Sequence, residues 1–298
     1  MRILLSGATG QLGREICRAR LPAGTSLLAA SRSGLDLARP ECVAAFVDRA
    51  KPDLIINAAA YTAVDGAEAE PDLALAINCH GAEALAKAAA LRHVPIMHFS
   101  TDYVFDGRKD GEWREEDEPN PLNVYGRTKR AGEIAVAAAN PRHLILRVSW
   151  LYSAHGRNFL KTMLRLGRER SRLSIVGDQV GRPTSAADLA EAAMRVATRA
   201  IESDGHWGLY HFSNSGAPVS WHGFASEIFR RTASPGTPLQ IEAITTQAFN
   251  ATAARPQNSV LNLGRIKHMF GIEPRSWQSA LADVVKQLPL ETVEREAS

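Results

Sequence analysis

Short apolar runs alternate with alanine-rich runs through the first 150 residues of the chain. The apolar runs predict strands at residues 2–7, 26–32, 53–59, 95–105 and 143–150. The runs between them predict helices at residues 11–20, 40–50, 71–93 and 128–140. Strands that alternate with helices form parallel βαβ units, in which helices cover both faces of the sheet. The pattern therefore predicts an α/β fold with a doubly wound parallel sheet.

The second half of the chain has a different pattern. Its strand candidates are short ("LSIV", "GLYHFS" and "LQIEAI"), and proline and glycine are frequent from Gly205 to Pro274. Residues 185–201 predict a helix that returns to the main sheet, and residues 220–232 and 276–288 predict two helices that begin at serine caps. We therefore expect residues 1–150 to form the main domain and residues 151–298 to form mostly a smaller lobe, with a frayed polar tail at 291–298.

Composition excludes several classes of protein. The 35 basic and 32 acidic residues of the 298 nearly balance, so nucleic-acid binding has no support. Three cysteines without CxxC spacing argue against a disulfide framework or a zinc site. The first apolar run is too short for a signal peptide, and no run reaches the roughly 18 residues of a membrane span. We expect a soluble cytoplasmic protein that does not bind membranes.

A glycine-rich turn follows the first predicted strand. The stretch "GATGQLG" places Gly7, Gly10 and Gly13 directly before the first predicted helix. Glycines allow backbone amides to approach a pyrophosphate, and the helix N-terminus supplies unpaired N–H groups. The spacing is GxxGxxG rather than GxGxxG, so the strand–turn–helix context carries the interpretation. A Rossmann-type dinucleotide site is favoured over a plain glycine turn.

The residues after the second and third strands bear on the cofactor. An acid at the end of the second strand would hold the ribose of NAD, whereas an arginine accommodates the 2′-phosphate of NADP. The chain has Arg32 there and its first acid only at Asp36, which favours NADPH and leaves NADH possible. Arg32 as an ordinary solvated loop residue is the alternative. The small residues of "NAAAYT", 57–62, suit either a close ligand or close helix packing.

Tyr125 and Lys129 are four residues apart at the start of a predicted helix, and thus share one face. A phenol has an ordinary pKa near 10, and a nearby ammonium eases its proton transfer. Thr101 ends the preceding strand and could hydrogen-bond to the same carbonyl oxygen that Tyr125 protonates. A YxxxK pair also arises by chance at exposed helix starts. Its place beyond the carboxyl ends of the strands favours a catalytic pair.

These segments together resemble a known superfamily. The glycine turn, "STDYVFDG", "NVYGRTK" and "RVSWLY" resemble the extended short-chain dehydrogenases/reductases. Within that superfamily the chain is similar to the dTDP-4-dehydrorhamnose reductases along nearly its whole length. Supporting segments are "NAAAYTAVDGAEAEP", "NFLKTMLRL", "GDQVGRPT" and "RPQNSVLN".

The resemblance implies a role for each matching residue. Tyr125 is the expected proton donor, Lys129 its modulator and ribose ligand, and Thr101 the hydroxyl that orients the carbonyl. Asp102 and Trp150 are expected to hold the deoxysugar. The implied reaction passes hydride from NADPH to C4 of a dTDP-4-keto-6-deoxy sugar, dTDP-4-dehydro-β-L-rhamnose, and gives dTDP-L-rhamnose. Beside the glycines and Arg32, the expected cofactor contacts are Gln11, Leu12, Asp36, Leu37, Ala60, Tyr61 and Thr62.

Related activities remain as alternatives. By resemblance, a nucleotide-sugar 4,6-dehydratase needs a glutamate two residues after the threonine, where this chain has Tyr103. An epimerase needs a further acid–base group, which the sequence does not reveal. A catalytically inactive, nucleotide-binding regulatory subunit is a third alternative, against which the complete Thr101, Tyr125 and Lys129 set argues.

The resemblance also raises a metal and a dimer. Glu15 matches a position where some relatives hold Mg²⁺ at a dimer contact, but no partner carboxylates are evident. A solvent-facing glutamate in a first helical turn is the favoured interpretation of Glu15. A homodimer is possible.

Overall fold

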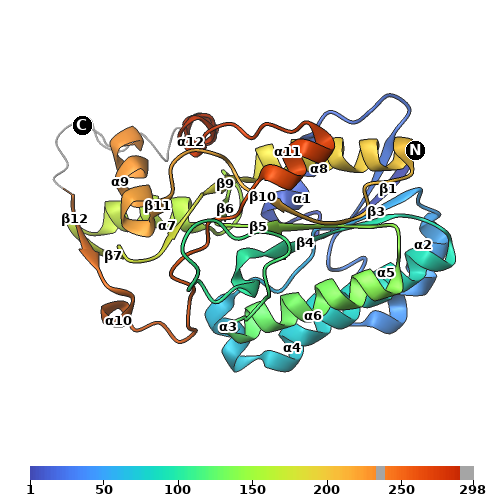
Figure 1. The fold of residues 1–298 in the computed structure, drawn as a ribbon, viewed down its shortest axis with the longest axis horizontal. Helices are drawn as coiled ribbons and strands as arrows, with labels where there is room; N and C mark the ends of the chain where they lie inside the picture. Colours follow the sequence, from blue (N-terminus) through green and yellow to red (C-terminus); the bar gives the residue numbers. More distant parts are fainter. Residues whose placement is uncertain (233–238, 289–298) are drawn as a thin grey trace.

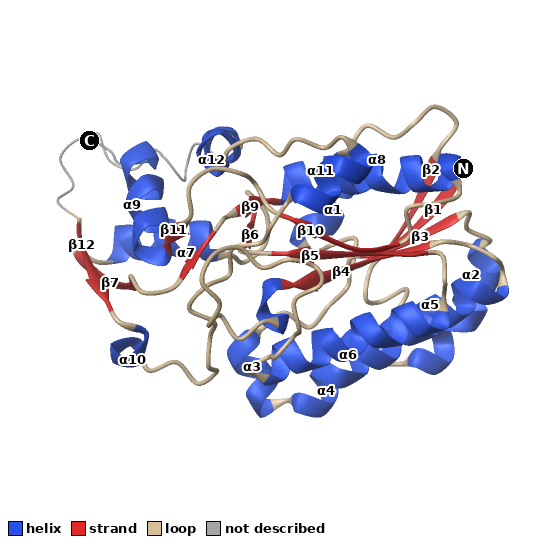
Figure 2. Cartoon of the chain, viewed as in Figure 1, coloured by secondary structure: helices blue, strands red, loops and turns tan. Residues whose placement is uncertain are grey.

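The structure is a computed structural model that describes residues 1–232 and 239–288. A six-stranded parallel sheet forms its centre, in the order β10-β5-β4-β3-β1-β2 (Figures 1 and 2). Its strands are β1 (Arg2–Ser6), β2 (Ser26–Ala30), β3 (Leu54–Asn57), β4 (Ile96–Thr101), β5 (His143–Val148) and β10 (Gly208–Phe212). This confirms the predicted α/β fold with a doubly wound parallel sheet.

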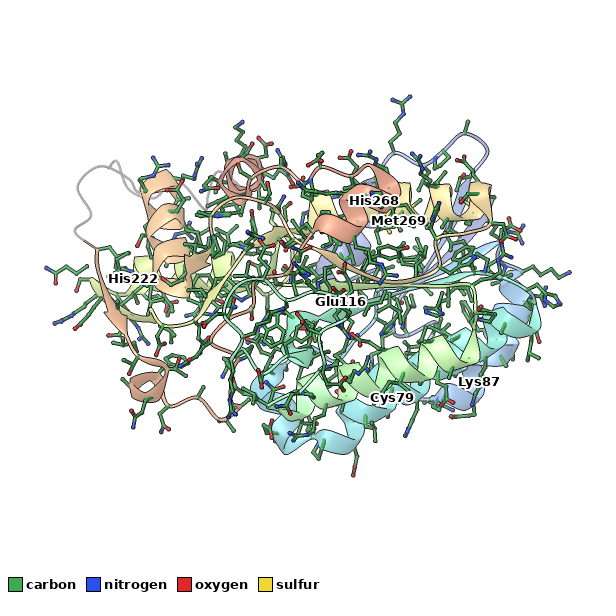
Figure 3. All side chains as sticks on the ribbon, in the orientation of Figure 1. Cys79, Lys87, Glu116, His222, His268 and Met269 are labelled. Carbon is green, nitrogen blue, oxygen red and sulfur yellow. The ribbon has the colours of Figure 1, made fainter. Side chains whose placement is uncertain are left out.

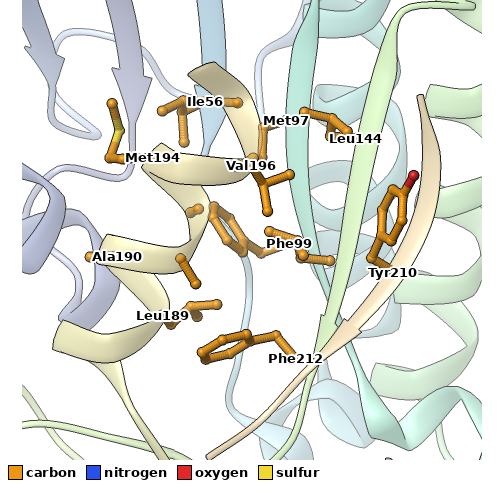
Figure 4. Packing of buried hydrophobic residues seen from close by; sticks show 14 of the residues in the cluster. Ile56, Met97, Phe99, Leu144, Leu189, Ala190, Met194, Val196, Tyr210 and Phe212 are labelled. Atoms are coloured by element: carbon orange, nitrogen blue, oxygen red, sulfur yellow. The ribbon is translucent and has the colours of Figure 1, made fainter. Parts of the chain in front are cut away.

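Helices cover both faces of the sheet, which explains why β3 and β4 are apolar runs buried at nearly every position. On one face, α1 (Gln11–Arg18), α8 (Ala186–Ser203) and α11 (Gly264–Phe270) pack on a core that includes Ile56, Phe99 and Phe212 (Figure 4). On the other face lie α2 (Val43–Ala50), entered through the 3-10 turn Pro40–Cys42, with α5 (Ala82–Leu91) and α6 (Val124–Ala139).

The helical run predicted at 71–93 is continuous but not regular. After α3 (Val64–Ala69), it consists of α4 (Pro71–Leu75), a π-helical segment (Ala76–Gly81) and α5. The buried Cys79 lies in this helical layer, beside α6 (Figure 3). A Cβ on Gly132 of α6 would stand 2.1 Å from the carbonyl oxygen of Asn78, so glycine allows the two backbones to touch there.

A second hydrophobic core lies beyond the end of the main sheet and includes Tyr152, Leu160, Phe224 and Trp277. Its helices are α7 (Phe159–Glu169), α9 (Trp221–Thr232) and α12 (Trp277–Lys286), near the short α10 (Thr246–Phe249). Three two-stranded sheets accompany them: β6 (Leu151–Tyr152) with β9 (Thr184–Ser185), β7 (Arg172–Val176) with β12 (Gln240–Ile244), and β8 (Val180–Gly181) with β11 (Val219–Ser220).

The second half of the chain contributes more to the main sheet than expected. The strand predicted at "GLYHFS" is β10, which pairs with β5 rather than joining the smaller lobe. Helix α11 also packs on the main core. The predicted serine caps are confirmed, because Ser220 accepts from the amide of Gly223 and Ser276 from that of Ser279. The predicted frayed tail lies outside the described residues.

Candidate active site

The polar candidates gather where the parallel strands of the main sheet end. The glycine turn follows β1, "NAAAYT" overlaps the end of β3, Thr101 ends β4, and Trp150 comes two residues after β5. The sheet order places β1, β3, β4 and β5 side by side, so these segments share one edge. That edge is where ligands bind in open α/β sheets.

The glycine turn is tightly packed against its neighbours. Gly7 has φ +70°, and a Cβ there would stand 2.5 Å from the backbone nitrogen of Ala59. A Cβ on Gly13 would stand 2.2 Å from the carbonyl oxygen of Gly7. Gly10 is the N-cap of α1 and provides no side-chain cap. The turn thus presents a helix N-terminus without a side chain over it, as a pyrophosphate site requires.

The first two residues of α1 have different surroundings. The side-chain oxygen of Gln11 accepts from the Ser153 hydroxyl at 3.2 Å and from the Asn158 amide at 3.0 Å. Gln11 therefore ties the start of α1 to the segment that leads into α7. Leu12 is buried in the main core.

A clamp of three hydrogen bonds holds the loop after β3. Asn78 accepts from the backbone N–H of Tyr61 at 2.8 Å and donates to its carbonyl oxygen at 3.1 Å. The same amide donates to Thr128 on α6 at 3.1 Å. The Tyr61 hydroxyl donates to Glu70 at 2.6 Å, and Ala60 and Thr62 flank Tyr61 in the loop. Asn78 therefore joins the predicted cofactor loop to α6, the helix that carries Tyr125 and Lys129.

The predicted 2′-phosphate residues lie beyond β2. The Arg32 side chain is 70% exposed, and its Nε lies 3.5 Å from a carboxylate oxygen of Asp36. Asp36 also accepts from the backbone N–H of Ala38 at 3.0 Å. Leu37 is buried in the hydrophobic cluster on the face of the main sheet that α2 and α5 cover. Because Arg32 is exposed and held only by a surface ion pair, it is free to turn toward a phosphate.

Tyr125 stands at the second position of α6, whose N-cap Asn123 accepts from the backbone N–H of Gly126. Burial of the phenol raises the pKa of Tyr125 to about 12, and a hydrogen bond with the Thr101 side chain opposes that rise. The ring of Tyr103 meets Tyr125 edge-on, with ring centroids 5.9 Å apart. The structure thus brings Thr101 and Tyr125 together as predicted, with a phenol that keeps its proton at neutral pH.

Lys129 lies one helical turn further along α6 and is 2% exposed. Its ammonium nitrogen donates to the carbonyl oxygen of Phe99 at 2.5 Å and lies 3.3 Å from Nε2 of His98. Burial lowers the pKa of Lys129 to about 8, and the charge of Glu133 opposes this shift. Lys129 is therefore close to its titration point at physiological pH.

Asp102 follows Thr101 and is 3% exposed. Its Oδ1 accepts from the Thr101 hydroxyl at 3.0 Å, whereas its Oδ2 is buried without a partner among the described residues. Burial raises the pKa of Asp102 to about 6, and the nearby hydroxyls of Ser259 and Thr101 oppose that rise. An unpartnered buried carboxylate oxygen is an acceptor ready for a ligand hydroxyl.

A buried ion pair supports this region from behind. Arg147 of β5 donates twice to Glu133 of α6, through Nε and Nη2, at 2.8 Å each. Both side chains are at most 2% exposed. The guanidinium also lies over the ring of Phe105, 4.9 Å from its centroid. This pair fixes α6 to β5, the strand beside β4. Because Arg147 offsets the negative charge of Glu133, that carboxylate stabilises the Lys129 ammonium less.

Trp150 has a left-handed backbone, φ +50°, and its indole is enclosed. One side faces Gly181, where a Cβ would stand 2.6 Å from the ring. Trp221 stacks on the ring with centroids 3.5 Å apart. The expected contact between Trp150 and a sugar remains a prediction. Trp221 lies beside the same candidate site, because its ring stacks on that of Trp150.

A pocket of about 450 Å³ lies between the segments 107–112 and 257–260, and Asp102 is not among its lining residues. Asn258 and Val260 line it on either side of Ser259, whose hydroxyl acts to lower the pKa of Asp102. Arg182 also lines this pocket, but its guanidinium already binds Glu112 and two backbone carbonyls. Arg255 is similarly held by Asp65 at 2.6 Å.

Comparison with known proteins identifies the family of the chain. The family model described as "RmlD substrate binding domain" matches residues 1–290. The chain belongs to this family. It is 42% identical over 290 residues to a dTDP-4-dehydrorhamnose reductase of Aggregatibacter actinomycetemcomitans, covering 95% of this chain and 98% of the relative.

Solved structures extend the match for this member of the RmlD family. A dTDP-4-dehydrorhamnose reductase from Clostridium acetobutylicum superposes with a TM-score of 0.89 at 40% identity, over 96% of this chain and 99% of that one. The enzyme of that name from Bacillus anthracis, solved in complex with NADP, superposes with a TM-score of 0.87 at 36% identity, over the same shares.

The possible Mg²⁺ contact of Glu15 stays a prediction for this RmlD family member, but the expected solvent-facing position of Glu15 is wrong. Glu15 is buried rather than solvent-facing, and its carboxylate lies 3.5 Å from Nε2 of His155. Arg18 also contacts that imidazole. Within residues 1–232 and 239–288, no three histidine, cysteine, aspartate or glutamate side chains come together as metal ligands do. Across the same residues, no helix is both long and apolar enough to span a bilayer.

The sequence did not reveal several residues of this RmlD-type site. Trp221, Asn78, His98 and Ser259 reach the site from segments that carry no motif for such roles. An asparagine inside a helical run and a histidine inside an apolar strand are the only signals that the sequence offers for two of them. Both are buried polar residues, which need a partner to be stable inside a protein.

Proposed function

We propose that the chain reduces the C4 keto group of dTDP-4-dehydro-β-L-rhamnose to give dTDP-L-rhamnose. NADPH supplies the hydride to C4 and Tyr125 supplies the proton to O4. The observation that carries the proposal is the contact between Thr101 and Tyr125 beside the glycine turn, with Lys129 one turn away. Membership of the family and relatives named dTDP-4-dehydrorhamnose reductase support the substrate.

The proposed roles follow the chemistry of each group. Thr101 and Tyr125 hydrogen-bond to the ketone oxygen, which then becomes an alcohol as hydride arrives at the carbon. The protonated phenol suits a donor rather than a base, because its pKa of about 12 keeps the proton in place until the oxygen becomes basic. Positioned acid catalysis of this kind contributes about 10² to 10⁴ in rate.

The nicotinamide cofactor would lie along the same edge of the sheet. Gly7, Gly10 and Gly13 would face its pyrophosphate, Ala60 to Thr62 would line its path, and Lys129 would reach its ribose. Arg32 would bind the 2′-phosphate of NADPH, and Asp36 and Leu37 would border the adenosine. The relative from Bacillus anthracis was solved with NADP, which supports NADPH over NADH.

The sugar nucleotide would enter beside Asp102. Its unpartnered Oδ2 would accept from a sugar hydroxyl, and Trp150 would contact the deoxysugar. We propose that residues 1–150, with helix 185–201, mainly bind the cofactor and that the smaller lobe helps to bind the substrate.

Elimination has no support in this site. The position of the dehydratase glutamate is Tyr103, and burial raises the pKa of that phenol above its ordinary value. A buried, protonated phenol cannot remove a proton beside the ketone at neutral pH. Reduction therefore fits better than dehydration.

The test is NADPH oxidation in the presence of the dTDP-4-keto sugar, with NADH and with other nucleotide sugars as comparisons. We expect turnover with the dTDP sugar and NADPH, and NADPH binding without turnover for Tyr125→Phe. Failure to reduce any 4-keto sugar would instead favour the regulatory-subunit alternative. Light scattering and cell fractionation test the homodimer and the cytoplasmic location, which are further parts of the proposal.

A further inference from the structure

A chain of buried polar side chains runs beneath the site, from β1 across β3 and β4 to Lys129. Ser6 donates to Oδ1 of Asn57 at 2.6 Å, the Asn57 amide lies 3.0 Å from Nδ1 of His98, and Nε2 of His98 lies 3.3 Å from Lys129 Nζ. All four side chains are at most 2% exposed. The role of this hydrogen-bonded network depends on which of its atoms carry hydrogens.

The backbone fixes the orientation of the Asn57 amide. The N–H of Ala59 can only donate, and it points to Oδ1 of Asn57 at 3.2 Å. Oδ1 therefore faces Ala59 and Ser6, and the NH₂ group faces His98. The NH₂ group can only donate, so Nδ1 of His98 must be the acceptor and cannot carry a proton.

His98 is consequently neutral, with its hydrogen on Nε2. Burial, with the neighbouring Lys129, lowers the pKa of His98 well below its ordinary value, which agrees with a neutral ring. The Nε2–H group then points at Lys129. A neutral lysine amine can accept from it while donating to the carbonyl oxygen of Phe99, whereas an ammonium has no lone pair to accept with.

We infer that His98 is a positioning residue that directs its Nε2–H group at Lys129 and thereby favours the neutral amine. This rests on the proposed function, in which Lys129 acts on Tyr125. After Tyr125 gives its proton to the ketone oxygen, the phenolate must be reprotonated. A protonated Lys129 that loses its proton readily can supply it, becoming the neutral amine that His98 stabilises, and water then returns the proton to Lys129.

The other charged groups around Lys129 do not explain this preference. On its own helix Glu133 favours the ammonium, but Arg147 of β5 binds both oxygens of that carboxylate. On the side of β4, Asp102 lies beyond Thr101 and accepts a hydrogen bond from the Thr101 hydroxyl. Tyr125 keeps its proton at neutral pH. His98 is the group that directs a hydrogen at the lysine nitrogen from within hydrogen-bond range.

A change of one heavy atom reverses the donors and acceptors in the hydrogen bonds from residue 57 through His98 to Lys129. In Asn57→Asp, one oxygen keeps the bonds from Ser6 and Ala59, and the other oxygen accepts from Nδ1 of His98. The hydrogen of His98 moves to Nδ1, and Nε2 becomes an acceptor for the ammonium. The alkaline limb of the pH profile of kcat should then move upward by about one pH unit or more. His98→Leu, which removes the N–H group, should move the limb in the same direction.

The carboxylate of Asn57→Asp also attracts the ammonium through its charge. The double variant Asn57→Asp/His98→Leu separates the two effects. If Asn57→Asp acts through the imidazole, the alkaline limb of the double variant should lie close to that of His98→Leu alone. His211→Leu is the matched control, since it removes another fully buried imidazole from the same sheet. We expect the alkaline limb of that variant to stay in place even where its stability falls.

Nitrogen NMR of ¹⁵N-histidine-labelled protein tests the tautomer without any turnover. We expect the His98 signal, assigned by its loss in His98→Leu, to show a neutral ring with hydrogen on Nε2, and to show the Nδ1–H form in Asn57→Asp. A ring with hydrogen on Nδ1 in the unaltered protein overturns the inference. An unmoved alkaline limb in both single variants also overturns it, whereas absence of turnover in the unaltered protein overturns only the proposed reaction.

Discussion

The indole of Trp150 lies flat against the indole of Trp221, with ring centroids 3.5 Å apart and planes within 6° of parallel. Trp150 follows β5 of the main sheet, and Trp221 begins α9 of the smaller lobe. Gly181 also lies close to the Trp150 ring, because a Cβ there would stand 2.6 Å from it. The two parts of the chain therefore meet through aromatic rings beside the proposed sugar site.

This packing makes Gly181→Ala a probe of Trp150 that leaves the indole intact. The new methyl group would stand 2.6 Å from the ring, so the indole must shift. We expect the KM for the sugar nucleotide to rise by about tenfold, as for a lost contact worth about 1.4 kcal/mol, with the affinity for NADPH unchanged. Gly205→Ala is the control, because its nearest neighbour would be 3.7 Å away. Equal KM values for the two variants would contradict a role for Trp150.

Arg32→Ala should weaken NADPH binding and leave NADH binding nearly unchanged. A charge-assisted bond to the 2′-phosphate is worth about 1.5–3 kcal/mol, which corresponds to a loss of about 10- to 100-fold in affinity. Fluorescence titration with each cofactor measures the two dissociation constants. Arg39→Ala removes a similarly exposed arginine, held by a surface pair with Glu41. If the two variants lose affinity for NADPH equally, Arg32 has no specific role.

Asp102→Asn should stabilise the protein at neutral pH while impairing reduction. The folded pKa of about 6, against 3.8 when solvated, means that the folded state binds the proton more tightly. Stability contributed by Asp102 is therefore present below pH 4 and is lost as the pH rises to 6. The variant should gain little at pH 4 and on the order of 2–3 kcal/mol above pH 6.

Urea unfolding of Asp102→Asn across that pH range provides the measurement. The exposed Asp72 gives the control Asp72→Asn, for which no such pH-dependent gain is expected. If the free energies of unfolding of Asp102→Asn and the unaltered protein differ by the same amount at pH 4 and pH 7, burial does not raise the pKa of Asp102.

The Glu133–Arg147 pair should be costly to break from one side. Arg147→Met leaves a buried carboxylate with the partly exposed Arg130 as its remaining ionic partner among the described residues, and should lower the free energy of unfolding by about 3–5 kcal/mol. In the double variant Glu133→Gln/Arg147→Met, no buried charge is left unpaired, so it should lose less than Arg147→Met alone. Chemical unfolding of all four proteins in this cycle measures the coupling. Additive losses would contradict it.

The sequence predicted the parts of the fold that depend on local pattern. The central strands, the glycine turn and the Tyr125–Lys129 spacing were all visible, because periodicity and helix geometry determine them. The place of β10 beside β5 could not be predicted, since pairing between strands some 60 residues apart leaves no local signal. His98 and Trp221 were missed for the same reason, because their roles exist only through neighbours that the fold supplies.

The close approach of Gly132 to Asn78 has a mechanical consequence. The backbones of the π-helical segment and α6 are in direct contact there, because Gly132 has no side chain to separate them. Sliding of α6 along its axis would separate this contact and break the bond from Asn78 to Thr128. Tyr125 and Lys129 therefore lie on a helix that this contact holds against sliding, so we expect any closure around a substrate to come from the smaller lobe.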